Sequence, residues 1–123
     1  MKKLVTLIVD DSSIIIQRFT EILGDMDNID AVLHANNYQE GSRVLEYVTP
    51  DVVLLDIILP DKSGIELLRH IQQLQIDTRV FMMTNQATEH YKKICVGLGA
   101  EHFFDKSNEF DLIPGIISGC HIN

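Results

Sequence analysis

LVTLIV, residues 4–9, is the stretch of sequence that decides the fold. The run is continuously apolar and does not alternate with polar residues, which is typical of a strand buried on both faces of a parallel sheet. VVLL, residues 52–55, has the same character and ends at Asp56. The two runs therefore predict two inner strands of one parallel sheet.

Amphipathic stretches alternate with further short apolar runs along the rest of the chain. Strands are expected at 80–83, 101–104 and, more weakly, 31–35. Apolar residues at helical spacing predict helices over about 12–23, 37–48, 63–74 and 88–98, with a weak one within 108–117. Asn37 and Ser63 each stand three residues before a glutamate, the spacing of a capping box at a helix start. Pro114 fits only the first turn of the last helix.

Five strands alternating with five helices place the chain in the α/β class. Right-handed crossovers between parallel strands lead to a doubly wound (βα)5, flavodoxin-like sandwich. For a sheet of five parallel strands the expected order is 2-1-3-4-5. Ligands of such sheets bind outside the carboxyl ends of the strands, so those ends are where functional residues are expected.

The composition is that of one globular domain, expected to span residues 1–123 with no separate output domain. A hydrophobic fraction of 46% is that of an ordinary soluble globular chain. The net charge of −8 disfavours binding to nucleic acid or to anionic membrane surfaces. Cys95 and Cys120 form no Cys-x-x-Cys pair and are expected to be small apolar residues in a reducing compartment. No apolar run approaches the ~20 residues that span a bilayer, so we expect a soluble, cytoplasmic protein.

Polar residues with useful chemistry follow four of the predicted strands: Asp10, Asp11, Asp56, Thr84 and Lys106. Three converging carboxylates repel one another unless a cation neutralises them. Mg2+, or Mn2+, is the hard cation that suits such oxygen ligands and also accepts a phosphoryl oxygen. Asp56 would then be a nucleophile that forms an acyl phosphate, with the Lys106 ammonium balancing charge and the Thr84 hydroxyl donating to a phosphoryl oxygen.

Each of these residues also has a plainer interpretation. Asp11 would cap a helix beginning at Ser12, Asp56 would belong to a turn, Thr84 would be a cap or strand residue, and Lys106 would be exposed. The spacing of all five at adjacent strand ends favours a shared site over five unrelated roles.

The chain resembles the receiver domains of two-component response regulators over essentially its whole length, as a stand-alone regulator of the chemotaxis or sporulation type. The matching segments are VDDS (9–12), LLDIILPDKSG (54–64), MMT (82–84) and GAEHFFDK (99–106). The resemblance implies that Asp56 accepts a phosphoryl group from a histidine kinase or a histidine phosphotransfer protein. It further implies that Asp10, Asp11, Asp56 and the backbone carbonyl of Ile58 hold Mg2+.

The same resemblance implies a switch. Thr84 and Phe103 match the hydroxyl and the aromatic residue that move together, and Lys106 matches the family's lysine. The face formed by the helix from Thr88, the strand 101–104 and the last helix would repack and engage a downstream protein in trans, or a second copy of the chain. The chain would then be no enzyme beyond its own phosphorylation and dephosphorylation.

Several positions depart from the family's usual pattern. Ser107 follows the lysine where proline is usual, Asn85 follows the threonine where a small residue is usual, and Phe103 replaces a frequent tyrosine. Ile58 and Gln86 match positions that tune the phosphoryl lifetime, and the apolar Ile58 favours a modestly long one.

Three other functions remain as alternatives. A Mg2+-dependent aspartyl-phosphate phosphohydrolase would need an acid two residues after the nucleophile, where Ile58 stands. A flavodoxin-like nucleotide binder would need a phosphate loop after the first strand, where Asp10 and Asp11 repel phosphate. A receiver that acts as an unphosphorylated scaffold would not need the acidic set.

Overall fold

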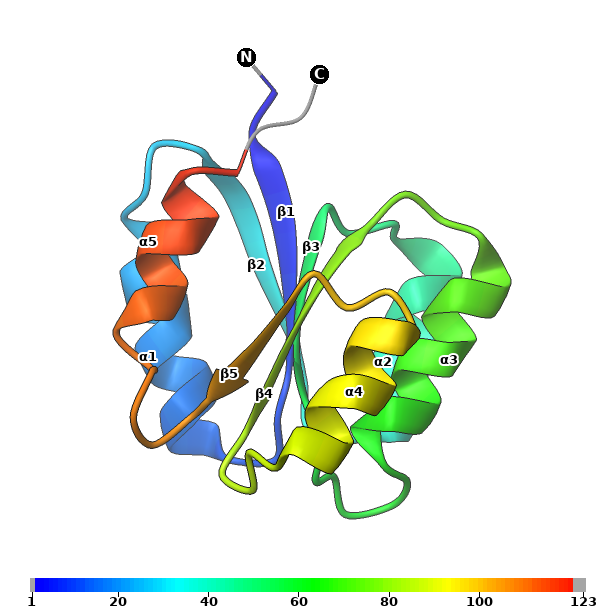
Figure 1. The fold of residues 1–123 in the computed structure, drawn as a ribbon. Coiled ribbons are helices and arrows are strands. Elements are labelled where there is room, and N and C mark those ends of the chain that lie inside the picture. Colours follow the sequence, from blue (N-terminus) through cyan, green and yellow to red (C-terminus); the bar gives the residue numbers. More distant parts are fainter. Residues whose placement is uncertain (1, 121–123) are drawn as a thin grey trace.

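The computed structural model describes residues 2–120, in which five strands and five helices alternate (Figure 1). The elements are β1 (Leu4–Val9), α1 (Ser13–Gly24), β2 (Ile29–Ala35), α2 (Tyr38–Tyr47), β3 (Val52–Asp56), α3 (Gly64–Leu74), β4 (Arg79–Thr84), α4 (Glu89–Gly97), β5 (His102–Asp105) and α5 (Leu112–Ser118). Within this range no helix is both long enough and apolar enough to cross a bilayer.

The strands form one parallel sheet in the order β2-β1-β3-β4-β5, which confirms the predicted topology. Helices α1 and α5 cover one face of the sheet, and α2, α3 and α4 cover the other (Figure 1). The inner strands β1 and β3 are neighbours, with Val9 paired to Leu55. This pairing brings the carboxyl ends of β1 and β3 to the same point at the lower edge of the sheet in Figure 1.

Two apolar layers explain why the strand sequences are continuously apolar. Successive side chains of a strand point to opposite faces. Leu7 and Val9 accordingly join the cluster beneath α2, α3 and α4, whereas Leu4 and Ile8 join the cluster beneath α1 and α5. Burial on both faces explains why the run LVTLIV shows no alternation of apolar and polar residues; its one polar residue, Thr6, is fully buried.

The helix starts agree with the predicted boundaries to within a few residues. Asn37 accepts a hydrogen bond from the Glu40 amide at 2.8 Å and caps α2. Ser63 caps α3 through the Ile65 amide, while the Glu66 carboxylate pairs with Arg69 on the exposed surface of the helix. The capping contact predicted for Ser63 is therefore present, whereas Glu66 forms an ion pair with Arg69.

Two weak predictions are confirmed as elements with shifted limits. Strand β2 begins at Ile29, two residues before the expected start, and lies at a sheet edge, where its outer positions are only partly buried. Helix α5 begins at Leu112, so that Pro114 lies in its first turn, as expected.

Candidate functional site

Three carboxylates meet where β1 and β3 end. Asp10 follows β1 directly and is fully buried, Asp56 is the last residue of β3 and is 4% exposed, and Asp11 is exposed to solvent. One oxygen from each of the three lies within 4.8 Å of the others. The structure thus brings together the acidic residues that the sequence predicted to converge.

A buried ammonium group completes this cluster. Lys106 Nζ lies 2.5 Å from Asp10 Oδ2 and 3.1 Å from Asp56 Oδ2, and the Lys106 side chain is 6% exposed. The Lys106 amide donates to the Thr84 carbonyl at 2.9 Å, which ties the end of β5 to the end of β4. Thr84 is fully buried, and its hydroxyl accepts a hydrogen bond from the Gln86 amide at 3.0 Å.

Local backbone contacts orient the two buried carboxylates. Asp10 Oδ1 accepts from the Ser12 amide at 2.8 Å, and Asp56 Oδ1 accepts from the Ile58 amide at 3.2 Å. The start of α3 also packs directly on the end of β3, because a Cβ at Gly64 would lie 1.9 Å from the Asp56 carbonyl oxygen. Only glycine permits this approach, and it fixes the loop that carries Ile58 beside the carboxylates.

The charges of the cluster shift the pKa values of its members. Burial raises the pKa of Asp56 and is the largest effect; the Lys106 ammonium lowers the pKa and the Asp10 carboxylate raises it, and the net result is a raised pKa. Burial alone would lower the pKa of Lys106, but its contacts with Asp10 and Asp56 outweigh this effect and raise the pKa above its ordinary value. Lys106 is therefore charged at neutral pH, and the ionised form of Asp56 needs further positive charge nearby.

The donor set fits a hard divalent cation. With all groups ionised, three carboxylates and one ammonium leave a local charge of −2. Asp10 Oδ2 is buried and is held only by its ion-pair contact with Lys106. Carboxylate oxygens, with one ligand residue open to solvent, are what Mg2+ or Mn2+ requires while it retains bound waters.

Two of the plainer interpretations are wrong. Ser12, and not Asp11, caps α1, since its hydroxyl accepts from the Ile15 amide at 3.4 Å. Lys106 is not exposed. Thr84 is indeed the last residue of its strand, while the cap of α4 is Thr88.

Two further predicted residues are Ile58, two positions beyond Asp56, and Phe103, within β5. The Ile58 side chain is 46% exposed, and Phe103 on β5 is partly buried against the apolar layer beneath α2, α3 and α4. Phe103 is paired in the sheet with Met82, two residues before Thr84. Phe103 and Thr84, which the family resemblance couples, therefore lie on neighbouring strands two register positions apart.

The two unusual residues Asn85 and Ser107 are hydrogen-bonded to each other. Ser107 Oγ donates to Asn85 Oδ1 at 3.2 Å, which joins the loop after β4 to the loop after β5. The Asp105 carboxylate accepts from the Ser107 amide at 2.9 Å and from the Asn108 side chain at 3.0 Å, so it holds the turn in place of a proline. The sequence identified both residues as departures but gave no sign that they are partners.

Comparison with known proteins places these features in a family. A family model described as the response regulator receiver domain matches residues 6–118. A protein-glutamate methylesterase/protein-glutamine glutaminase of Clostridium acetobutylicum is 35% identical over 108 residues, which are 86% of this chain and 31% of that protein. The chain spans about a third to three-fifths of the length of such curated relatives.

Solved structures give the same result. The signal receiver domain of a DNA-binding response regulator from Colwellia psychrerythraea has a TM-score of 0.85 and 26% identity, covering 94% of this chain and 95% of its own. A CheY-like receiver domain from Methanospirillum hungatei has a TM-score of 0.82 and 29% identity, covering 95% and 92%.

Proposed function

Since this chain belongs to the response regulator receiver domains, we propose that Asp56 is its phosphoacceptor and that a histidine kinase or a histidine phosphotransfer protein is the donor. The observation that carries the proposal is the buried cluster in which Lys106 contacts both Asp10 and Asp56 beside the solvent-exposed Asp11. Such a cluster combines a nucleophilic oxygen with the positive charge that phosphoryl transfer needs.

The transfer is a single displacement at phosphorus. An Asp56 carboxylate oxygen forms the new bond to phosphorus as the bond to the donor's histidine nitrogen breaks, and that electron pair leaves with the imidazole. The Lys106 ammonium balances the charge that spreads over the phosphoryl oxygens. Bound Mg2+ or Mn2+, held by Asp10, Asp11, Asp56 and the carbonyl of Ile58, would supply further charge neutralisation.

Phosphorylation would be read out by Thr84 and Phe103. An acyl phosphate at Asp56 adds negative charge and acceptor oxygens, to which the Thr84 hydroxyl donates after giving up its bond to the Gln86 amide. The vacated space lets Phe103 turn inward, and the face formed by α4, β5 and α5 repacks. A downstream protein, or a second copy bound through this face, stabilises the phosphorylated conformation by its difference in affinity.

The partners and the cellular compartment that we expect follow from this role as a phosphoacceptor. The chain acts through protein partners in the cytoplasm, without binding nucleic acid or membrane, and catalyses only its own phosphorylation and dephosphorylation. Its net charge of −8 supports the absence of polyanionic partners.

Acetyl phosphate tests the assignment of Asp56. Intact mass spectrometry should show a gain of about 80 Da in the presence of Mg2+, with none after chelation and none for Asp56→Asn. Asp27→Asn, a change at an exposed aspartate, is the matched control and should be phosphorylated as wild type is. Modification of Asp56→Asn at the wild-type rate would contradict the proposal. Repeated turnover of a phosphate ester would favour the phosphohydrolase alternative.

Thr84→Ala tests the readout separately from the chemistry. The variant should still gain the phosphoryl mass, because Asp56, Asp10 and Lys106 are intact. In amide NMR spectra, the shifts that phosphorylation causes along α4 and β5 should be largely lost. Shifts equal to those of the wild type would exclude Thr84 as the coupling residue.

A further inference from the structure

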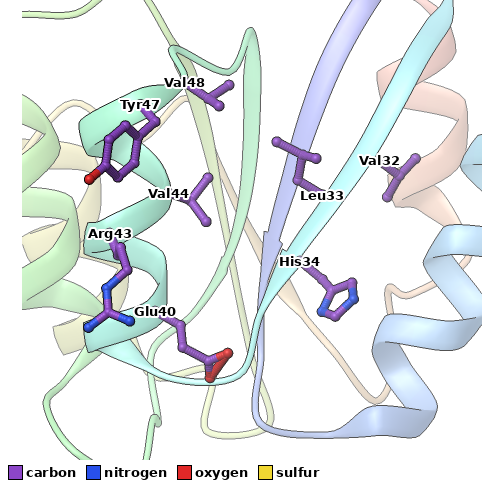
Figure 2. A pocket seen from close by; sticks show the side chains of 8 residues that line it. All are labelled: Val32, Leu33, His34, Glu40, Arg43, Val44, Tyr47 and Val48. Atoms are coloured by element: carbon purple, nitrogen blue, oxygen red, sulfur yellow. The ribbon is translucent and has the colours of Figure 1, made fainter.

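A groove of about 650 Å³ runs along one edge of the sheet, between β2 and α2 (Figure 2). Its lining residues are Val32, Leu33, His34, Glu40, Arg43, Val44, Tyr47 and Val48. Figure 2 shows Leu33 pointing toward α2, whereas Val32 and His34 point to the other side of the strand. The groove therefore follows the free edge of β2, and α2 does not cover that edge.

The groove combines an open strand edge with exposed apolar surface. Strand β2 is hydrogen-bonded to β1 on one side only, so its other edge is available for pairing. Strand β2 contains no proline, and its one charged residue, Asp30, lies near its start, so residues 31–35 lack the two features that usually protect such an edge. Beside them, the Tyr47 side chain is 83% exposed, the most exposed of the large hydrophobic residues described.

The rim of the groove carries one charge of each sign. Glu40 and Arg43 are both exposed on α2, and neither forms an ion pair with another residue in the range 2–120. A two-fold symmetric contact presents the same surface from both copies. Two such grooves facing each other can set Glu40 of each copy against Arg43 of the other.

We propose that this groove, defined as the β2–α2 groove, is a contact site for a second copy of the chain. The two β2 strands pair in antiparallel fashion about a two-fold axis near Leu33, which is the centre of the uncharged run 31–35. A second copy is favoured because it supplies both requirements of the groove at once, an open strand edge and the complementary charges. The contact is distinct from the α4, β5 and α5 face and does not depend on phosphorylation of Asp56.

The contact should be weak and dependent on salt. Each copy carries a net charge of −8, which opposes association over long range, whereas Glu40 and Arg43 leave the groove itself close to neutral. Added salt screens the long-range repulsion more than it weakens short-range apolar contacts. In sedimentation velocity, the dimer fraction should rise with protein concentration. It should also be higher in about 0.3 M NaCl than in about 0.03 M NaCl, because the screening length is shorter at the higher ionic strength.

Charge variants test the geometry. Arg43→Glu places like charges across the axis and should weaken dimerisation at least about fivefold, a coupling typical of close interface charges. The double variant with Glu40→Arg and Arg43→Glu exchanges the two charges, restores complementarity and should recover dimerisation. Lys93→Glu, on exposed α4, changes the net charge by the same amount as Arg43→Glu and is the matched control.

A cysteine at the expected axis gives an independent measurement. Leu33→Cys should form an intermolecular disulfide on mild oxidation, because opposite residues of antiparallel strands lie within bridging distance. The natural Cys95 and Cys120 are buried, so the wild type should not cross-link. A chain that remains monomeric at all concentrations overturns the proposal. A dimer weakened by Lys93→Glu and not by Arg43→Glu places the contact on the α4 face and also overturns it.

Discussion

At the scale of single residues, Lys106 decides the character of the site. Its ammonium lies between two buried carboxylates, Asp10 and Asp56, which would otherwise face each other without compensation. Even so, burial and the Asp10 charge leave the pKa of Asp56 raised. The Lys106 ammonium alone therefore does not offset the cost of burying the ionised Asp56 carboxylate, and the site is predisposed to bind a further cation.

The raised pKa of Asp56 predicts an unusual gain of stability from a mutation. A carboxyl whose pKa is higher in the folded than in the unfolded state stabilises the fold when protonated, and this contribution is lost as pH rises through the folded pKa. Asp56→Asn should therefore increase the free energy of unfolding at pH 7 in the presence of a metal chelator. Urea denaturation from pH 7 to pH 4 measures the difference, which should shrink toward acid pH. A destabilised Asp56→Asn at pH 7 would contradict the pKa direction.

At the scale of elements, the loop after β3 is tied to α2 by one side chain. Asp61 accepts hydrogen bonds from the Tyr38 amide at 2.8 Å and the Gln39 amide at 3.0 Å, so it satisfies free amides in the first turn of a helix distant in sequence. Lys62 Nζ lies 4.8 Å above the Tyr38 ring centroid in the same contact. The loop that leaves Asp56 is thereby coupled to the helix that borders the β2–α2 groove.

This contact predicts a stability change in acid. Although the slight burial of Asp61 acts to raise its pKa, the amides of Tyr38, Gln39 and Lys62 outweigh it and lower the pKa. A carboxyl with a lowered pKa stabilises the fold above its unfolded pKa, and this contribution is lost as pH falls through the folded pKa. Asp61→Asn should lower the urea midpoint at pH 7 and have progressively less effect below about pH 4. Asp25→Asn, at an exposed aspartate, is the control; an effect of Asp61→Asn independent of pH would refute the role of the carboxylate.

The junction of β3 and α3 predicts a position that tolerates only glycine. A methyl group at Gly64 would overlap the Asp56 carbonyl, so Gly64→Ala should cost more than about 2 kcal/mol of unfolding free energy through overpacking. Gly97 lies at the end of α4 with nothing within 4 Å of its would-be Cβ, and Gly97→Ala should be neutral or stabilising by up to about 1 kcal/mol. Chemical denaturation of both variants measures the contrast, and equal effects would show that the start of α3 is free to move away from the end of β3.

At the scale of the whole molecule, the cation should appear as added stability. A ligand that binds only the folded chain stabilises it by RT ln(1 + [L]/Kd), about 1.4 kcal/mol when its free concentration is ten times Kd. Millimolar MgCl2 should thus raise the melting temperature by several degrees, and NaCl of equal ionic strength should not. Asp11→Asn, which removes the exposed carboxylate of the cluster, should abolish most of the increase; an unchanged response would place the cation elsewhere.

The sequence alone predicted the sheet and the polar side chains that meet at its carboxyl edge. LVTLIV and VVLL predicted inner strands because a strand buried on both faces is largely apolar, and the order 2-1-3-4-5 was expected as the common arrangement of five strands in a doubly wound fold. Asp10, Asp56 and Lys106 could be expected together because strand ends of a parallel sheet share one edge. The limits of β2 were less accurate, since an edge strand is only partly buried and its pattern is weak.

Contacts between segments distant in the chain were decided only by the tertiary structure. Three features depend on distances that helix packing sets to within about an ångström. They are the hydrogen bond between Ser107 and Asn85, the hydrogen bond from the Tyr38 amide of α2 to Asp61, and the open groove beside β2. Local sequence patterns carry no such information, because many side chains could make each contact and the pattern records only the need to be polar or exposed. Apolar periodicity determines which residues face the core. Whether two particular polar atoms come within hydrogen-bond distance depends on how the helices pack against the sheet.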